Sequence, residues 1–71
     1  MSLKQELRQH LAPQLRQIRA DKKLYLSKVA YDCKRSPHAI DTIELGNNAS
    51  LKKYLQLASY YGKRVRVELV D

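Results

Sequence analysis

Few side chains in this sequence could serve as metal ligands or catalytic groups. Cys33 and His38 stand five positions apart, but a zinc site needs four ligands and the sequence offers no second pair. His10 belongs to a separate segment near the N-terminus. No serine, histidine and carboxylate can be placed in a shared cleft, and no glycine-rich loop is present to hold a phosphate. We therefore expect no metal, no cofactor and no enzymatic activity.

The size and charge of the chain favour binding through a surface. Its 71 residues predict one small domain, and a chain this short buries only roughly 60% of the surface that its unfolded form exposes. Lysine and arginine number 14 against 7 aspartates and glutamates, for a formal net charge of +7. This excess favours a polyanionic partner, namely DNA, RNA or an anionic membrane surface.

Cysteine use and hydropathy predict the compartment. A single cysteine, Cys33, cannot form an internal disulfide, and no apolar stretch approaches the roughly 20 residues of a membrane span. The first segment, MSLKQELRQH, lacks the uninterrupted apolar stretch of a secretory signal. We therefore expect a soluble protein of the reducing cytoplasm, with no membrane partner.

The first third of the chain has helical spacing. Apolar residues recur every three or four positions on one face, at Leu3, Leu7, Leu11, Leu15 and Ile18. Pro13 interrupts this pattern, because proline suits the first turn of a helix but not its interior. The helix is therefore expected to start near Ala12 and Pro13, with residues 2–10 as a preceding or kinked helical arm.

The segment LYLSKVAYDCK predicts a second helix of little more than two turns. Ser27 or the residue before it is a suitable N-cap, and the inward positions are Val29, Ala30 and Cys33. Lys34 and Arg35 then make a tight connection to the next helix.

A third, equally short helix has clear signals at both ends. Ser36 is a favoured N-cap, Pro37 is a favoured first helical residue, and Gly46 ends the helix. Ile40 and Ile43 are expected as its buried pair.

A fourth helix is expected between Ser50, as its N-cap, and Gly62, which closes it. Its inward positions are Leu51, Tyr54, Leu55, Leu57, Ala58 and Tyr61. Short helices separated by capping residues predict an all-α, compact bundle of four to five helices over residues 11–62.

The five tyrosines are unaccompanied by Phe or Trp. Helical spacing assigns Tyr54, Tyr61 and Tyr31 to core or dimer contacts with hydroxyl groups that reach water, rather than to a platform for stacking single-stranded bases. The spacing does not decide whether Tyr25 and Tyr60 are buried or exposed.

Residues 63–71 change from helical to strand spacing. Charged and apolar residues alternate, in the order Arg64, Val65, Arg66, Val67, Glu68 and Leu69. A lone strand needs a partner for its backbone groups, and a second copy of the chain supplies one about a two-fold axis. If the two strands run antiparallel about Val67, Arg66 faces Glu68 of the second copy and Val65 faces Leu69. We therefore expect a homodimer held by these strands.

The second and third helices form a helix-turn-helix pattern. Two short helices are joined by three or four residues, and the second is short enough to lie across a groove. The major groove of DNA, about 12 Å wide, engages only two or three turns of a helix. The short third helix is therefore suited to this groove.

From about Leu11 to Gly62 the chain resembles the lambda-repressor-like, or XRE-type, helix-turn-helix family, which includes Cro and phage repressors. The segments IRADKKL and IELG carry the resemblance best. An arginine late in the first helix commonly pairs with the glutamate that ends the third helix in this family, and Arg19 and Glu44 stand at those positions. The C-terminal strand is similar to that of antitoxin-type regulators, which dimerise through a shared two-stranded ribbon.

The resemblance implies DNA contacts. Family positions that match Pro37, His38 and Thr42 commonly reach base edges; His38 could bond guanine or adenine, and Thr42 could touch a thymine methyl group. Asp41 is expected to face sideways, away from phosphate. Basic residues on or beside the helix-turn-helix are candidate phosphate contacts: Arg16, Arg19, Lys23, Lys28, Lys34 and Arg35.

Two departures from the family pattern support an alternative. The turn carries Lys34 and Arg35 where relatives usually have a glycine and a small or apolar residue, and Leu26 replaces a glutamine that commonly opens the second helix. These changes favour a fold used to bind protein, as an antitoxin, an antiactivator or a phage-encoded inhibitor of another regulator.

The function expected from the sequence is sequence-specific binding of double-stranded DNA. The chain would regulate transcription as a repressor, acting as a homodimer on a palindromic operator with half-sites about one helical turn apart. It would be bacterial or phage-encoded and associated with the nucleoid. A toxin or another regulator is the protein partner under the alternative.

Overall fold

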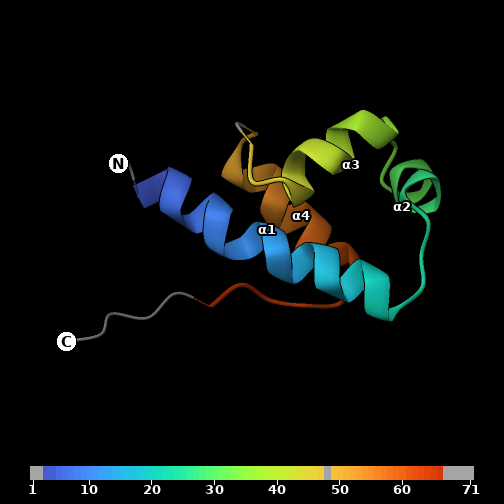
Figure 1. Cartoon of the computed structure of the whole chain (residues 1–71), viewed down its shortest axis with the longest axis horizontal. Coiled ribbons are helices and arrows are strands. Elements are labelled where there is room, and N and C mark those ends of the chain that lie inside the picture. The colour runs from blue at the N-terminus through green and yellow to red at the C-terminus, as the bar shows by residue number, and fades with distance from the viewer. Residues whose placement is uncertain (1–2, 48, 67–71) are drawn as a thin grey trace.

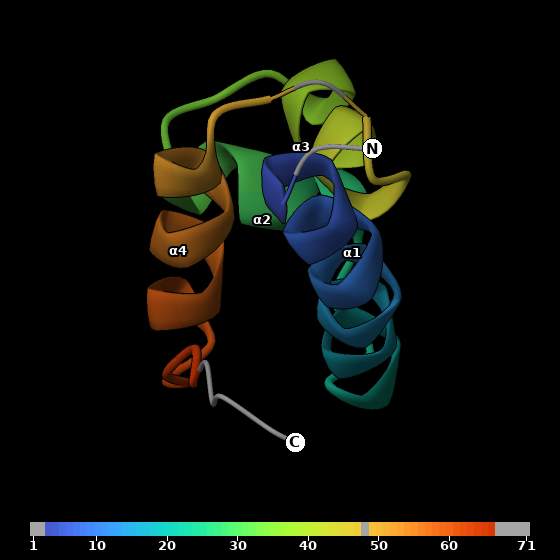
Figure 2. The same ribbon diagram turned by 90° about the vertical axis from the view of Figure 1, so that its left-hand side faces the viewer.

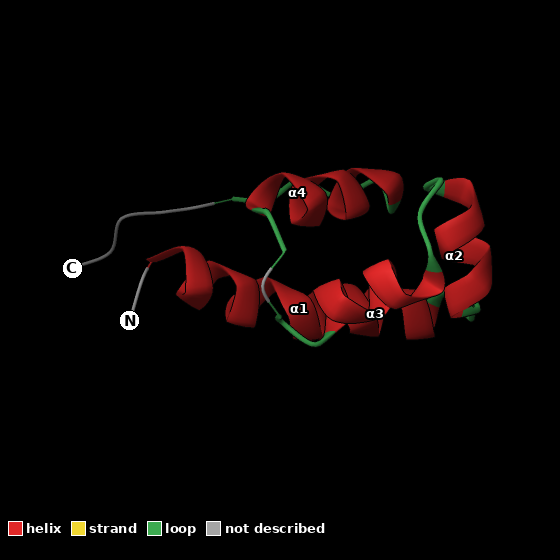
Figure 3. Cartoon of the chain, turned by 90° about the horizontal axis from the view of Figure 1, so that it is seen from above, coloured by secondary structure: helices red, strands yellow, loops and turns green. Residues whose placement is uncertain are grey.

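The computed structural model describes residues 3–47 and 49–66, and this part of the chain is all-helical. It contains the four helices α1 (Leu3–Asp21), α2 (Leu26–Asp32), α3 (Pro37–Glu44) and α4 (Leu51–Tyr60) (Figure 1). Helices α1 and α4 pack lengthwise side by side (Figure 2), whereas α2 lies across one end of the bundle and α3 lies against α1 (Figure 3). The predicted all-α class is confirmed.

All four helices contribute to one hydrophobic core. Its buried side chains are Ala12, Leu15, Val29, Ala30, Ile40, Ile43, Tyr54, Leu57, Ala58 and Tyr61, with Leu11, Ile18 and Cys33 partly buried against them. Most of the predicted inward positions are therefore correct. Leu55 is an exception, since 48% of its surface is exposed. At about 100° per residue, Tyr54, Leu57, Ala58 and Tyr61 share one face of α4, and Leu55 falls at its edge.

The tyrosines of the chain differ in burial. Tyr54 and Tyr61 are buried, as expected. Tyr31 is 81% exposed because it lies on the side of α2 opposite Val29, so it is not a core residue, and its dimer contact stays a prediction. The expectation that the buried hydroxyls reach water is also wrong. The Tyr54 hydroxyl donates to the Asn47 carbonyl at 2.9 Å, and the Tyr61 hydroxyl is buried without a partner among the residues described.

Helix α1 begins earlier than the sequence suggested. It starts at Leu3 and continues through Pro13, so the expected start near Ala12 is wrong. Pro13 is exposed, and the carbonyl that its missing N–H leaves free can be solvated. The N-terminal turns are also fixed by tertiary contacts, because Arg8 Nε donates to the Ala49 carbonyl at 2.6 Å and Gln5 Nε2 to the Gly46 carbonyl at 3.2 Å.

Helix α2 also starts earlier than expected. Its N-cap is Tyr25, which provides no side-chain hydrogen bond, rather than Ser27 or the residue before it. Leu26 is partly buried against the core, so packing rather than capping determines where the helix begins.

The predicted ends of α3 and α4 are confirmed. The Ser36 hydroxyl accepts a hydrogen bond from the Ala39 N–H at 3.1 Å, and Pro37 is the first helical residue. Gly46 and Gly62 follow α3 and α4, each with a φ of +74°, in the left-handed region that glycine adopts without strain. Ser50 is the N-cap of α4, although its side chain makes no capping hydrogen bond.

The C-terminal segment is described only to residue 66. Residues 63–66 form no strand in this single chain, and Val65 is partly buried against the core. The predicted dimer contacts of Val67, Glu68 and Leu69 lie outside the described residues. Within the described ranges, no helix combines the length and the apolar character needed to cross a bilayer.

Candidate nucleic-acid interface

Helices α2 and α3 pack against each other through a tight turn whose left-handed residue is Lys34. Lys34 has a φ of 57°; its N–H donates to the Tyr31 carbonyl at 3.1 Å, and the Arg35 N–H donates to the Ala30 carbonyl at 2.9 Å. This pair of bonds is the usual left-handed helix ending, in which glycine is the common residue. The turn therefore keeps the glycine-type geometry with a lysine in its place.

The end of α1 repeats this arrangement. Lys23 has a φ of 56°, its N–H donates to the Ala20 carbonyl at 3.0 Å, and the Leu24 N–H donates to the Arg19 carbonyl at 3.1 Å. Helices α1 and α2 thus end with lysines, and α3 and α4 with glycines, in the same left-handed conformation. A side chain in this region costs roughly 1–2 kcal/mol relative to glycine.

A bidentate ion pair fixes the C-terminal end of α3 to α1. Arg19 Nε lies 2.6 Å from Glu44 Oε2, and Arg19 Nη2 lies 3.0 Å from Glu44 Oε1. Glu44 is buried, and its hydrogen bond to Arg19 raises the pKa of that guanidinium. This is the pair that the family resemblance implied.

Arg19 has a second partner, because its Nη1 donates to the Leu24 carbonyl at 2.9 Å. Each of its three nitrogen atoms is therefore bonded within the protein. These bonds give Arg19 an anchoring role. Two of its five N–H donors remain, so its contact with phosphate stays a prediction.

The outer side of α3 presents Pro37 and His38 to solvent. Thr42 is partly buried, and its hydroxyl donates to the His38 carbonyl at 2.9 Å, as is common for threonine within a helix. Asp41 is also partly buried. Of the three predicted base-reading residues, Pro37 and His38 are thus more accessible than Thr42.

The six predicted phosphate contacts fall into two sets. Arg16, Lys23 and Lys34 are exposed and have no acceptor in the part of the chain that is described. Arg19, Lys28 and Arg35 have partners: Lys28 Nζ lies 3.1 Å from Asp32 Oδ1, and Arg35 donates to the side chain of Gln56. The first set is therefore freer to meet a polyanion.

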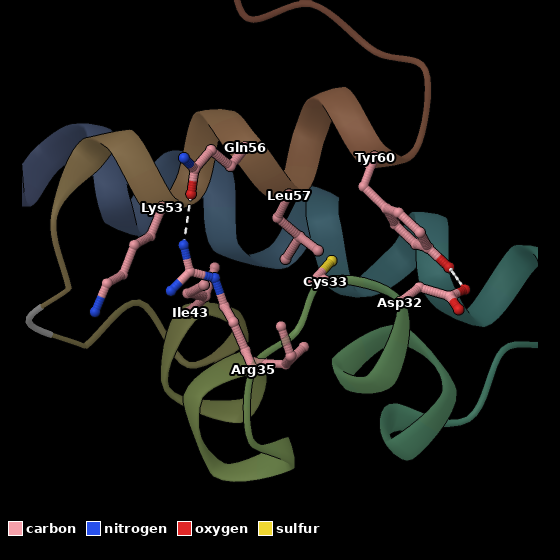
Figure 4. Close-up of a pocket in the computed structure, with 9 residues that line it drawn as sticks. Asp32, Cys33, Arg35, Ile43, Lys53, Gln56, Leu57 and Tyr60 are labelled. Carbon is pink, nitrogen blue, oxygen red and sulfur yellow. Dashed lines mark hydrogen bonds between the residues drawn. The ribbon is translucent and has the colours of Figure 1, made fainter.

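A second pair of contacts joins α4 to the helix-turn-helix and was not anticipated from the sequence. The Tyr60 hydroxyl donates to the Asp32 carboxylate, and Arg35 reaches Gln56 (Figure 4). The hydrogen bond from Tyr60 lowers the pKa of Asp32, and the bond from Lys28 lowers it further. Contacts between residues 21 or 28 positions apart leave no local pattern by which they could have been found.

No group of three histidine, cysteine or acidic side chains that could hold a metal ion occurs in residues 3–47 and 49–66. Comparison with protein-family models, with curated proteins and with solved structures gave no match. Function must therefore be inferred from the residues of this chain.

Proposed function

We propose that this chain is a lambda-repressor-like helix-turn-helix protein that binds double-stranded DNA sequence-specifically as a homodimer and represses transcription. The observation that carries the proposal is the way α3 is held. Ile40 and Ile43 fix its inner side in the core and the Arg19–Glu44 pair fixes its end, whereas His38 faces solvent. A rigid helix with a polar, exposed first turn is what major-groove readout needs.

Exposed cations that have no acceptor among the described residues support phosphate binding. Lys23 and Lys34 occupy left-handed positions where glycine would fold with less strain, and both side chains are exposed. Backbone strain of this kind is often retained where a side chain has a function. In this proposal Lys23, Lys34 and Arg16 hold the protein in register on phosphates while His38 and Thr42 contact base edges.

A dimer on a palindromic operator completes the proposal. Two copies joined by their C-terminal segments would place two α3 helices in successive major grooves, about one helical turn apart. Repression then follows from occlusion of promoter DNA.

The proposal is tested by measuring affinity for a random-sequence duplex by fluorescence anisotropy over a series of salt concentrations. Affinity should fall steeply with salt, and Lys34→Gln should reduce the log–log slope by about one unit. Lys4→Gln is the matched control, because it removes the same charge from an exposed lysine at the far end of α1 (Figure 1). A flat salt response would contradict phosphate binding.

A second candidate function is supported by exposed aromatic and apolar residues. Tyr25 and Tyr31 are each 81% exposed, and Leu45 is 57% exposed. Tyrosine is enriched at protein interfaces because it adds apolar area and a hydrogen-bonding group. If the duplex titration shows no binding at low salt, the favoured hypothesis becomes binding of a protein partner, such as a toxin or another regulator. Tyr31→Ala should then weaken that complex while leaving the fold intact.

A further inference from the structure

The outer side of α2 carries tyrosines and lysines in alternation. From the N-cap of the helix to the turn after it, every third residue belongs to this series: Tyr25, Lys28, Tyr31 and Lys34. Positions three apart form a continuous ridge on the surface of a helix. Aromatic rings and cations thus alternate along one ridge of α2, which we call the tyrosine–lysine ridge.

The tyrosine–lysine ridge is open to solvent. Tyr25 and Tyr31 are each 81% exposed, and the side chain of Lys28 is 57% exposed. Lys34 is exposed as well. Helix α2 lies across one end of the bundle, so its outer side meets no other element of the described chain (Figure 1, Figure 3). A ligand could therefore reach all four side chains.

The lysines of the ridge keep donors for an anion. Lys28 Nζ lies 3.1 Å from Asp32 Oδ1, but an ammonium group has three N–H donors, so two remain. Asp32 also accepts from the Tyr60 hydroxyl, and its charge is therefore shared between two partners. Lys34 has no acceptor among the described residues.

This alternation matches the chemistry of a single nucleic-acid strand. Each base of a single strand has a face that can stack on an aromatic ring, and each phosphate can accept from a lysine. Six residues at 1.5 Å each separate Tyr25 from Tyr31 by about 9 Å along α2, with Lys28 between them. A duplex is a poorer match, because its bases are already stacked on each other and offer the tyrosines no free face.

We propose that the tyrosine–lysine ridge binds single-stranded nucleic acid. One base would stack on each tyrosine ring, and the phosphates between them would lie on the lysines. RNA and single-stranded DNA share this chemistry. Lys34 also belongs to the proposed duplex contacts, so the assignment depends on Tyr25 and Tyr31. The 81% exposure of Tyr31 removes the core position that argued against a stacking platform.

The five tyrosines allow a direct test on the unmodified chain. Oligothymidylate and oligouridylate of about eight nucleotides are titrated in turn against protein with carbon-13-labelled tyrosine rings. In NMR spectra, stacked bases should move the Tyr25 and Tyr31 signals upfield and saturably, and leave the buried Tyr54 and Tyr61 rings in place. The oligonucleotide with the lower Kd identifies DNA or RNA as the better ligand. No saturable shift at Tyr25 and Tyr31 with either strand would overturn the proposal and leave a protein partner for this face.

An abasic DNA strand of the same length separates stacking from charge. It keeps the phosphates but lacks the bases, so it should bind at least about tenfold more weakly than oligothymidylate. It should also leave the tyrosine signals in place. Equal affinities would mean that the strands respond only to the +7 charge of the chain, and would overturn the site.

Matched substitutions of Tyr31 test the ring itself. Tyr31→Phe keeps an aromatic ring and should change the affinity for oligothymidylate less than about twofold, whereas Tyr31→Leu keeps only an apolar side chain and should weaken binding about tenfold. The exposure of Tyr31 means that neither change removes a core contact. Equal affinities of the two variants would contradict stacking on this ring.

A duplex titration separates this site from the proposed function. Tyr31→Leu should leave the affinity for a random-sequence duplex within about twofold of the unmodified chain, because stacking on the ring needs a free base face. An equal, tenfold loss on duplex and single strand would overturn the assignment of a single-strand site. The oligothymidylate and abasic titrations involve no duplex, so their outcome does not depend on whether α3 binds DNA.

Discussion

Tyr54 and Tyr61 are both buried tyrosines of the core, but only one of their hydroxyl groups has a partner. Tyr54 donates to the Asn47 carbonyl, whereas no partner is found for Tyr61 in the described chain. Tyr54→Phe should therefore lower the free energy of unfolding by about 1 kcal/mol, and Tyr61→Phe should raise it by about 1 kcal/mol. Urea unfolding followed by circular dichroism measures both values. The same sign for the two changes would contradict this account.

The ionisation of Tyr61 gives a pH dependence. Burial raises the pKa of Tyr61 from 10.0 to about 12. The unfolded chain therefore loses this proton before the folded chain does. The resulting stabilisation is fully present below pH 10 and is lost as the pH rises towards 12.

We accordingly expect Tyr61→Phe to make the fall in unfolding free energy above pH 10 shallower than in the unmodified chain. Urea unfolding at a series of alkaline pH values measures this difference. Parallel curves for the two proteins would mean that Tyr61 titrates alike in both states.

In the turn between α2 and α3, Lys34 adopts the left-handed conformation that the turn requires, and its side chain is a proposed phosphate contact. Lys34 adopts a φ of 57°, so Lys34→Gly should raise the free energy of unfolding by about 1 kcal/mol. Lys34→Ala is the control, because alanine keeps the strain and removes the same charge. If the two variants have equal stability, the left-handed conformation is not the source of the cost.

The link between α1 and α3 depends on the Arg19–Glu44 pair. Glu44 is buried and Arg19 is partly exposed, so Glu44→Ala should lower the free energy of unfolding by about 3 kcal/mol, the lower end for a broken buried pair. Lys28→Gln removes an exposed pair with Asp32 and should shift the urea midpoint far less. Equal shifts for the two variants would contradict the anchoring role of Glu44.

The elements that local chemistry controls were predicted well from the sequence. Ser36, Pro37 and Gly46 delimit α3 because capping and left-handed geometry depend on near neighbours. The start of α1 was predicted wrongly, because the docking of Arg8 onto the Ala49 carbonyl, 41 positions away, offsets the effect of the interior proline. Such a contact leaves no local signal in the sequence.

The candidate site was predictable to a similar extent. The exposure of His38 and the pairing of Arg19 with Glu44 agree with the motif. The engagement of Arg35 by Gln56 and of Thr42 by its own helix backbone depends on side-chain placement, which residue spacing does not fix. A core position for Tyr31 was wrongly allowed, because periodicity over a seven-residue helix distinguishes the two sides of that helix poorly.

For the whole molecule, symmetry and charge determine how the proposed DNA binding would work. A formal charge of +7 on 71 residues raises the rate and affinity of binding to any polyanion, but it selects no sequence. Selectivity for a base sequence would come from α3. Because two copies related by a two-fold axis would bind one duplex, the preferred DNA site would be an inverted repeat.

Sequence-specific binding is tested most directly by selecting bound duplexes from a random pool with the full chain and sequencing them. We predict enrichment of an inverted repeat whose half-sites are centred about 10 base pairs apart, one turn of the double helix. A pool that stays random after repeated selection at low salt, with the protein folded, would contradict this prediction.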